Sequence, residues 1–432
     1  MQLREKVTLL INKFASARKK DSYMSFLKRK HSDFFQKKGF PSYRNEEWKN
    51  TDINSIINQD YNIISENEKI KNIEPKKIKD LTFLKKERSF ILVFVDGKYN
   101  PYFSYTYAEN IILSNIISIK ESEIKDYYGR LSYQYDAFYT LNTLLSIDGA
   151  YIYIPNHVIL ENPIEILHIS TGIESKIMLN NRNLIVVGEH SHVKIIEHSK
   201  CLKKHSPFIN SVSEIYAMNH SIIDYYKVQN DLVETSIIDN TYLKQNENSK
   251  CTVYTFSFQG NFIRNNLKFY SIGKKTYSYL YGISLLSGKQ FVDHHTLIDH
   301  LCSDAYSFQL YKNILSEKSK GIFNGKIIVN KLIKEINAFQ KNHNIILSNE
   351  ASIYAKPQLE IYSEYVKCSH GCTIGSIQES ELFYLQSRGI PEKKAKMLLL
   401  LSFLGEVLIP IHIFELKKLI NRKIKEKLDK NL

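Results

Sequence analysis

The sequence has little that would mark an extracellular or membrane-spanning protein. Its 432 residues include only five cysteines. An odd, scattered set of this kind is unlike a disulfide framework and is typical of a reducing compartment. No apolar run is long enough to span a bilayer, and the N-terminal segment lacks the apolar core of a secretion signal. We therefore expect a cytoplasmic protein with no membrane partner.

The motifs of common enzyme classes are also missing. The chain has no GxxxxGK[ST] phosphate loop, so we expect it to bind no nucleotide, and it has no GxSxG elbow. Asp293–His300 carries three histidines and two carboxylates, but not in the HExxH order of a zinc helix. We interpret this segment as a polar part of a β structure, with metal binding as the lesser alternative. Nothing in the sequence forms a convincing catalytic dyad or triad.

The net charge of +14 does not indicate a nucleic-acid partner. A binding groove would gather Lys and Arg on one face, because phosphate neutralisation needs clustered cations. Here the lysines are spread along the chain among abundant Ile, Asn and Tyr. This mixture also arises from AT-rich codon usage, and we expect no nucleic-acid partner.

Three regions follow one another along the chain. Residues 1–88 begin with helical spacing of apolar residues up to Lys38, continue through a break at Gly39 to the single tryptophan, Trp48, and end in a Lys- and Asn-rich connector over 54–88. Trp48 is interpreted as a packing anchor. Residues 89–375 are rich in β-branched and aromatic runs, and helical spacing returns over residues 376–432.

The middle region predicts many short strands with few helices between them. The expected strands are Ile91–Val95, Tyr151–Ile154, Leu184–Val187, Val193–Ile196, Cys251–Phe258 and Ile327–Val329. We expect turns or strand ends at Asp96-Gly97, Asp148-Gly149, Gly188, Gly260, Gly288 and Asn324-Gly325. This pattern argues against a doubly wound α/β sheet and leaves a sandwich, a barrel or a β-solenoid open. No clean sequence repeat separates the three.

The C-terminal region predicts two longer helices. Pro391 suits the first turn of one helix, and the stripe Ile413, Leu416, Ile420, Ile424 and Leu428 predicts the last. The leucine-rich stretch Met397–Leu408 either caps the β region or offers a docking surface to a partner.

The stretch Lys356–Gly371, KPQLEIYSEYVKCSHG, contains the strongest candidate ligands. Cys368 and His370 are two residues apart, so in an extended segment their side chains face the same way, and Cys372 continues this parity. Thiolate and imidazole are suitable ligands for a soft metal ion or an iron-sulfur cluster. Spacing alone leaves two readings open, a ligand pair and a buried apolar cysteine.

Several segments together resemble the SufB/SufD scaffold proteins of the SUF iron-sulfur cluster assembly system, most closely the SufD branch. Arg44–Asp52 is similar to the family's RNEEWKYTD, and Gly260–Leu267 is similar to its G-x-x-x-RNNL stretch. The remaining blocks follow in the family's order: Asp293–His300, Ser307–Lys312, Gly321–Gly325, Lys356–Gly371 and Leu382–Ile390.

The resemblance implies a mainly β protein with a right-handed parallel β-helix core and helical regions at both ends. It implies a non-catalytic scaffold that pairs with a SufB-like subunit through the β-helix and binds a SufC-like ATPase through its C-terminal helices. The cargo would be a transient iron-sulfur cluster shared with the partner, and the resemblance leaves open a flavin in the assembled complex. The residues implied for ATPase binding are Leu382, Leu385, Arg388, Gly389, Met397 and Leu401.

Within this resemblance His370 is the implied cluster-site residue, with Cys368 beside it, and Cys372 is an extra thiol that we interpret as a neutral substitution. SufB-like sequences have glutamates on both sides of the histidine, whereas this chain has Ser369 and Gly371. Tyr365 stands where the family more often has an acid, so we expect no carboxylate ligand there.

Two other readings compete with the SufD-like scaffold. One is a stand-alone β-helix enzyme that acts on an anionic polymer, which the basic charge favours, and the other is a SufB-like scaffold. The isolated chain could also form a homodimer through an exposed sheet edge.

Overall fold

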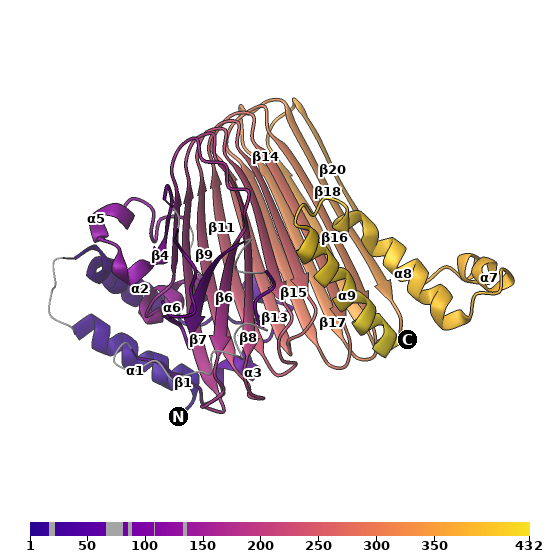
Figure 1. Cartoon of the computed structure of the whole chain (residues 1–432), viewed down its shortest axis with the longest axis horizontal. Helices are drawn as coiled ribbons and strands as arrows, with labels where there is room; N and C mark the ends of the chain where they lie inside the picture. Colours follow the sequence, from indigo (N-terminus) through magenta and orange to yellow (C-terminus); the bar gives the residue numbers. More distant parts are fainter. Residues whose placement is uncertain (17–21, 66–80, 85–88, 108, 133–135) are drawn as a thin grey trace.

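Two mainly parallel β-sheets, stacked face to face, form the body of the molecule (Figure 1). The structure is a computed structural model that describes residues 1–16, 22–65, 81–84, 89–107, 109–132 and 136–432. Consecutive strands from β5 onward alternate between the two sheets, so the chain coils as a β-solenoid. The prediction of a parallel β-helix is therefore confirmed, and the sandwich and the barrel are excluded.

We call the sheet that ends in β19 the first sheet and the sheet that ends in β20 the second sheet, and each has ten strands within the described residues. The first sheet contains β1 (Asn62–Ile63), β4 (Ile112–Asn115), β5 (Ala150–Ile154), β7 (Ile177–Val187), β9 (Phe208–Ala217), β11 (Ser236–Gln245), β13 (Phe262–Ser271), β15 (Phe291–His300), β17 (Lys320–Val329) and β19 (Ser352–Ile361). The second sheet contains β2 (Phe90–Val95), β3 (Lys98–Tyr99), β6 (Ile164–Ser170), β8 (His192–Cys201), β10 (Ile222–Gln229), β12 (Lys250–Ser257), β14 (Tyr277–Leu286), β16 (Tyr306–Leu315), β18 (Ile336–Ile346) and β20 (Val366–Gly375).

Side chains from both sheets meet in the interior of the solenoid. The central cluster takes alternate residues of each strand, such as Ile152 and Ile154 from the first sheet and Val193 and Ile195 from the second. Alternation follows from the pleat, because successive side chains of a strand point to opposite faces. Each turn of the coil therefore buries its inward face against the turns before and after it.

The N-terminal helices cover the outer face of the first sheet. They are α1 (Leu3–Ser16), α2 (Tyr23–Lys38), α3 (Asn54–Ile57), α5 (Glu121–Ile124) and α6 (Ala137–Leu145), with 3₁₀ turns at Glu46–Trp48 and Ile116–Ser118. Val7, Trp48 and Phe138 pack in one cluster with Phe208 and Phe262 of the sheet. Trp48 is thus a packing anchor, as predicted. Most of the predicted connector over 54–88 lies outside the described residues.

Two C-terminal helices, α8 (Glu392–Leu408) and α9 (Phe414–Asn431), cover the outer face of the second sheet. A third, α7 (Glu379–Ser387), has no buried residue and lies away from this face. The predicted stripe of the last helix is confirmed, since Leu416, Ile420, Ile424 and Leu428 of α9 are all buried in a cluster with sheet residues such as Tyr254. In the part of the chain that the structure describes, no helix is long and apolar enough to cross a membrane.

The strands are longer than the sequence predicts, and one expected boundary is wrong. Asn324-Gly325 lies in the middle of β17 and not at a turn. A Cβ atom on Gly325 would come within 2.2 Å of Gln340 Nε2, so this glycine makes room for a side chain from the opposite sheet. Polar residues continue the strands because the interior accepts hydrogen-bonded amides and hydroxyls, which a search for apolar runs does not detect.

Candidate functional site

The last turn of the coil is the most exposed part of the β-helix. It consists of β19 and β20, which we call the terminal rung, and each is the end strand of its sheet. Most side chains of β20 are exposed, whereas the earlier strands of the same sheet are largely buried. An end strand has unpaired backbone N–H and C=O groups on its outer side, and these groups favour pairing with another chain.

The predicted ligands lie on β20 and share its inward side. The register places Cys368 beside Ala338, His370 beside Gln340, and Cys372 beside Asn342 of β18. Cys368 is partly buried and packs against the inward cluster at this end of the coil. His370 and Cys372 are exposed. The structure thus brings the three side chains to the open mouth between the two sheets.

The two thiols differ in their surroundings. Burial raises the pKa of Cys368 and also that of Cys372. Both are therefore protonated thiols at neutral pH and become ligands only when a metal displaces the proton. Cys372 Sγ lies 3.6 Å from Asn342 Oδ1 and 3.9 Å from Asn344 Nδ2, so weak polar contacts already hold it.

The terminal rung does not form a complete metal site by itself. Among the described residues there is no group of three or more His, Cys, Asp or Glu side chains that could hold a metal ion. An iron-sulfur cluster usually has four protein ligands, and one imidazole with one or two thiols supplies fewer. Chemically, this end of the molecule can supply part of a ligand set.

Asp293–His300 belongs to strand β15 and is a polar part of the β structure, as predicted. Arg264 Nη1 donates to Asp293 Oδ2 at 2.7 Å, and Thr51 Oγ1 donates to the same oxygen at 2.5 Å. The Arg264 guanidinium lies 3.7 Å from the centre of the Trp48 ring. Burial opposes the charge of Asp293, but His295 and Arg264 outweigh burial and hold the pKa of this carboxyl below its ordinary value. These contacts fasten the N-terminal segment to the β-helix.

The paired acids near Trp48 belong to the same junction. Glu47 Oε2 lies 3.3 Å from His295 Nδ1, a bond that lowers the pKa of Glu47 to about 2. Lys356 Nζ donates to Glu46 Oε1 at 2.6 Å. The two carboxylates border a cavity of about 320 Å³ between this turn and the first sheet. Their pairing with cations fits a structural role better than proton transfer.

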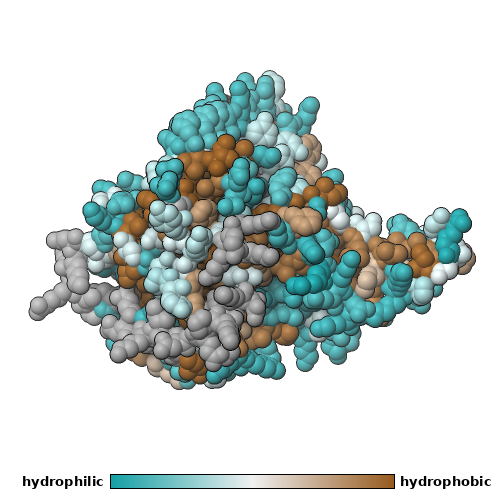
Figure 2. Space-filling view, in the orientation of Figure 1, coloured by the Kyte–Doolittle hydropathy of each residue, from teal (hydrophilic) through white to brown (hydrophobic). Residues whose placement is uncertain are grey.

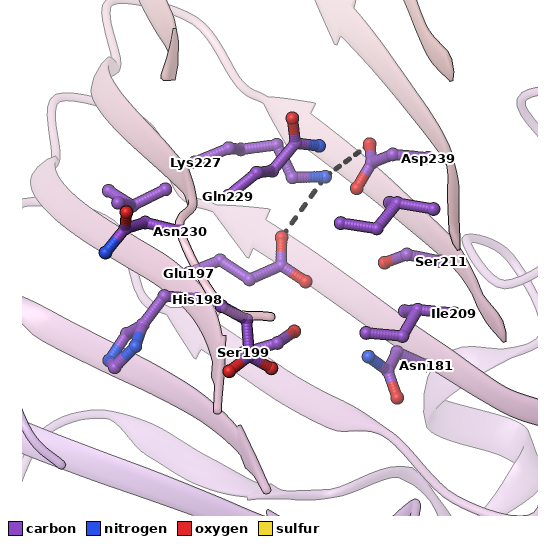
Figure 3. Close-up of a pocket in the computed structure, with 13 residues that line it drawn as sticks. Asn181, Glu197, His198, Ser199, Ile209, Ser211, Lys227, Gln229, Asn230 and Asp239 are labelled. Atoms are coloured by element: carbon purple, nitrogen blue, oxygen red, sulfur yellow. Dashed lines mark hydrogen bonds and ion pairs between the residues drawn. The ribbon is translucent and has the colours of Figure 1, made fainter. Parts of the chain in front are cut away.

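A fully buried ionic group lies deeper in the coil (Figure 3). Lys227 Nζ lies 3.2 Å from Glu197 Oε2 and 2.6 Å from Asp239 Oδ1, so one ammonium bridges two carboxylates. Burial raises the pKa of Asp239 against the attraction of Lys227. The adjoining cavity is about 30 Å³, which is room for about one water molecule. We therefore assign this group to the internal structure and not to ligand binding.

The C-terminal helices separate the residues implied for ATPase binding into two sets. Met397 and Leu401 of α8 pack against the cluster on the second sheet. Leu382, Leu385, Arg388 and Gly389 lie on α7 and just after it, where no residue of the helix is buried. We call α7 and the loop that joins it to α8 the C-terminal arm, and it projects away from the body (Figure 1).

The sequence reasoning missed the most exposed apolar residues of this arm. Phe383 is 72% exposed and Tyr384 is 57% exposed, and Leu398 of α8 is also exposed. Hydrophobic side chains are visible along the arm in Figure 2. The signal was present in the sequence as Leu-Phe-Tyr-Leu over 382–385, a run with no polar residue to face solvent. Such a patch on a projecting helix is typical of a protein-docking surface.

Comparison with known proteins places the chain in a family. Residues 168–403 match the family described as SUF system FeS cluster assembly, SufBD core domain, and residues 6–166 match the SufBD protein N-terminal region. An iron-sulfur cluster assembly SufBD family protein of Synechocystis is 28% identical over 390 residues, which cover 87% of this chain and 85% of that protein.

The relatives that carry the name iron-sulfur cluster assembly protein SufD include two bacterial proteins. The one from Escherichia coli is 26% identical over 90% of both chains, and the one from Bacillus subtilis is 26% identical over 66% of both. Members of the family are scaffold proteins and are generally not enzymes. The chain belongs to the SufBD family of SUF iron-sulfur cluster assembly proteins.

Proposed function

We propose that this chain is the SufD-like subunit of a cytoplasmic SufBCD-type complex, and that it holds part of the site where an iron-sulfur cluster is assembled as cargo. The observation that carries the proposal is the position of His370 and Cys368, side by side on the inward face of the terminal rung. Two relatives named SufD and the absence of glutamates beside His370 favour this branch over SufB.

The terminal rung is the proposed surface for a SufB-like partner. A second β-helix can continue the two sheets, because parallel strands add to an open edge through backbone hydrogen bonds. Four exposed aromatic or aliphatic side chains lie near the open edge of the terminal rung: Tyr354, Tyr362, Tyr365 and Ile374. Covering them would remove apolar surface from water, which favours association.

The partner would complete the ligand set. His370 is the main ligand in this proposal because its imidazole is exposed and needs no loss of a thiol proton. Cys368 is the second ligand, and the raised pKa of its thiol makes its contribution depend on bound metal. Cys372 is turned to Asn342 and Asn344, and we leave it outside the ligand set.

The C-terminal region, residues 376–432, would bind the SufC-like ATPase through its arm. The arm residues Leu382, Leu385, Arg388 and Gly389 lie on a projecting segment that a partner can surround. Met397 and Leu401 would support this surface from below, since they pack against the body. Phe383 and Tyr384 extend the apolar patch.

The test is co-expression of this chain with its SufB-like and SufC-like partners, followed by measurement of iron and sulfide per complex. We expect His370→Ala to leave the complex assembled and to lower both contents several-fold. Ser369→Ala is the matched control, because Ser369 is equally exposed on the same strand but faces the other side. Unchanged iron and sulfide in His370→Ala, or turnover of an anionic polymer by the isolated chain, would overturn the proposal.

A further inference from the structure

A column of polar side chains runs inside the solenoid and ends at His370. The register of the second sheet places Gln309 beside Gln340 and Gln340 beside His370. Gln309 and Gln340 are fully buried, whereas His370 is exposed at the open end. The three residues have the same parity on their strands, so their side chains follow one another along the interior.

Hydrogen bonds orient the two amides of this column. Gln309 Nε2 donates to Thr296 Oγ1 of the first sheet. Gln340 Nε2 donates in turn to Gln309 Oε1 at 2.8 Å. Each amide nitrogen therefore donates to a residue farther inside the coil. Gln340 Oε1 is the last acceptor in this series of hydrogen bonds.

This last acceptor is buried and free. Gln340 Oε1 has no hydrogen-bond partner in the part of the chain that the structure describes. A buried carbonyl oxygen without a donor is unfavourable, and most such groups in folded proteins are satisfied. The next residue in the column is His370, whose imidazole carries an N–H donor in either neutral tautomer.

Glycine at position 325 keeps this arrangement in place. A Cβ atom there would come within 2.2 Å of Gln340 Nε2 and 2.8 Å of Gln340 Cδ. The amide of Gln340 thus occupies space that only a glycine on the opposite sheet leaves open. Its position is set from two sides, by Gly325 and by the bond to Gln309.

We propose that Gln340 is a positioning residue for His370, and that its Oε1 accepts a hydrogen bond from one imidazole N–H. The hydrogen bond would fix one tautomer of His370. The other ring nitrogen then presents its lone pair to the proposed interface with the partner. Histidines that bind metals commonly donate their second ring N–H to an oxygen in this way. The inference rests on the proposed function of His370 and adds the residue that orients it.

Cys372 does not compete for this role. Its sulfur contacts Asn342 and Asn344, which belong to the neighbouring columns of the same sheet. The strand register therefore places the free Gln340 Oε1 beside the His370 imidazole, whereas the Cys372 thiol already has polar contacts.

The first experiment measures the tautomer of His370 in the full-length chain. Nitrogen NMR of histidine-labelled protein distinguishes the two ring nitrogens, and the His370 signals are identified by their loss in His370→Ala. We expect one dominant tautomer in the unmodified chain and in Gln340→Glu, which keeps an acceptor oxygen. Gln340→Leu should give a mixture. Identical tautomer populations in the unmodified chain and in Gln340→Leu would overturn the inference.

A matched control separates positioning from general loss of packing. Gln229→Leu removes another buried amide from the same sheet, where Gln229 binds Asn265 and Ser257 far from the open end. It should lower stability much as Gln340→Leu does, yet leave the His370 signals unchanged. A change of equal size in both variants would assign the effect to packing and would contradict the inference.

The second experiment uses the assembled complex and distinguishes this inference from the proposed function. We expect Gln340→Leu to lower iron content, with about a tenfold weaker iron affinity, and Gln340→Glu to retain most of it. If His370→Ala loses iron but Gln340→Leu does not, the proposed function stands and the positioning role fails. If His370→Ala keeps its iron, the proposed function fails, while the tautomer measurement still decides whether Gln340 orients His370.

Discussion

The face of the first sheet that the N-terminal helices cover and the open end of the β-helix differ in how completely their polar groups are paired. On the covered face, Arg264 of β13 is held by Asp293 of β15 and stacked on Trp48. At the C-terminal end, the terminal rung has an open edge, and Gln340 Oε1 has no partner within the described residues. The covered face therefore supplies stability, and the open edge retains strand N–H and C=O groups that a partner can pair.

This difference gives a physical reason for the proposed ligands to lie where the chain is least protected. A site shared between two subunits needs an edge, exposed apolar residues and incomplete coordination, and each of these lowers the stability of an isolated chain. The same features inside the coil would be costly, because a buried unpaired group has no water to bind. If the comparison is correct, substitutions on the covered face should change folding, and substitutions at the open end should change assembly.

The largest expected effect is on the covered face of the first sheet. Arg264→Met should leave Asp293 buried without its guanidinium partner and lower the free energy of unfolding by about 3–5 kcal/mol. Urea denaturation monitored by circular dichroism measures this change. Arg388→Met, on the exposed arm, is the control and should change stability by less than about 0.5 kcal/mol. Equal effects in the two variants would remove the distinction between covered and exposed parts of the molecule.

Acid should destabilise the covered part through its buried histidines. Burial lowers the pKa of His294 to about 4, so between about pH 6.5 and pH 4 the unfolded chain binds a proton that the folded chain does not. The contribution is fully present above pH 6.5 and is lost as the pH falls, by about 3 kcal/mol in total for this residue. Burial also lowers the pKa of His300 and of His31, so both residues should likewise lower stability as the pH falls.

The measurement is urea denaturation at pH 7.5 and at pH 5. The unmodified chain should be less stable at the lower pH, and His294→Gln should reduce this difference while it lowers stability at pH 7.5, because the bonds to Ser284 and Asn265 are lost or altered. A pH dependence of unchanged size in His294→Gln would contradict the prediction.

A smaller loss of stability is expected when a glycine inside the solenoid is replaced by alanine, and almost none when a glycine at the open end is replaced. Gly325→Ala places a Cβ atom against Gln340 and should cost about 1–3 kcal/mol, because the interior is already filled. Gly371→Ala is the matched variant at the open end, where no atom lies within 4 Å of the added carbon, and it should change stability by less than about 0.5 kcal/mol. Thermal denaturation of both variants decides the point.

The smallest effect on stability is expected on the C-terminal arm. Phe383→Ala should leave the melting temperature nearly unchanged, because the ring is exposed, and should weaken binding of the ATPase partner by about 1–2 kcal/mol. Isothermal titration calorimetry measures the binding. The contrasting variant is Phe256→Ala, which removes a buried ring from the second sheet and should cost about 3–5 kcal/mol of stability. Unaltered binding in Phe383→Ala would show that the ATPase docks elsewhere.

Much of the fold could be predicted from the sequence because its signals are local. The stripe on α9, the anchoring of Trp48 and the change from helical to β texture all follow from spacing within a few residues. The strand lengths could not be predicted in this way. Polar residues such as Asn324 interrupt the apolar runs, and only the neighbouring turns of the coil show that they continue the strand.

For the candidate site, the sequence alone identified Cys368 and His370 as a pair, because two residues of equal parity in a strand face the same side. Only the tertiary structure decided that they lie on the last turn of the coil, and that Gln340, thirty positions before His370 in the chain, lies beside it. Contacts between turns join residues that have no local relation, and no pattern within one strand contains them. The sequence thus determined the candidate ligands, and the coiling of the chain decided which residue lies beside His370.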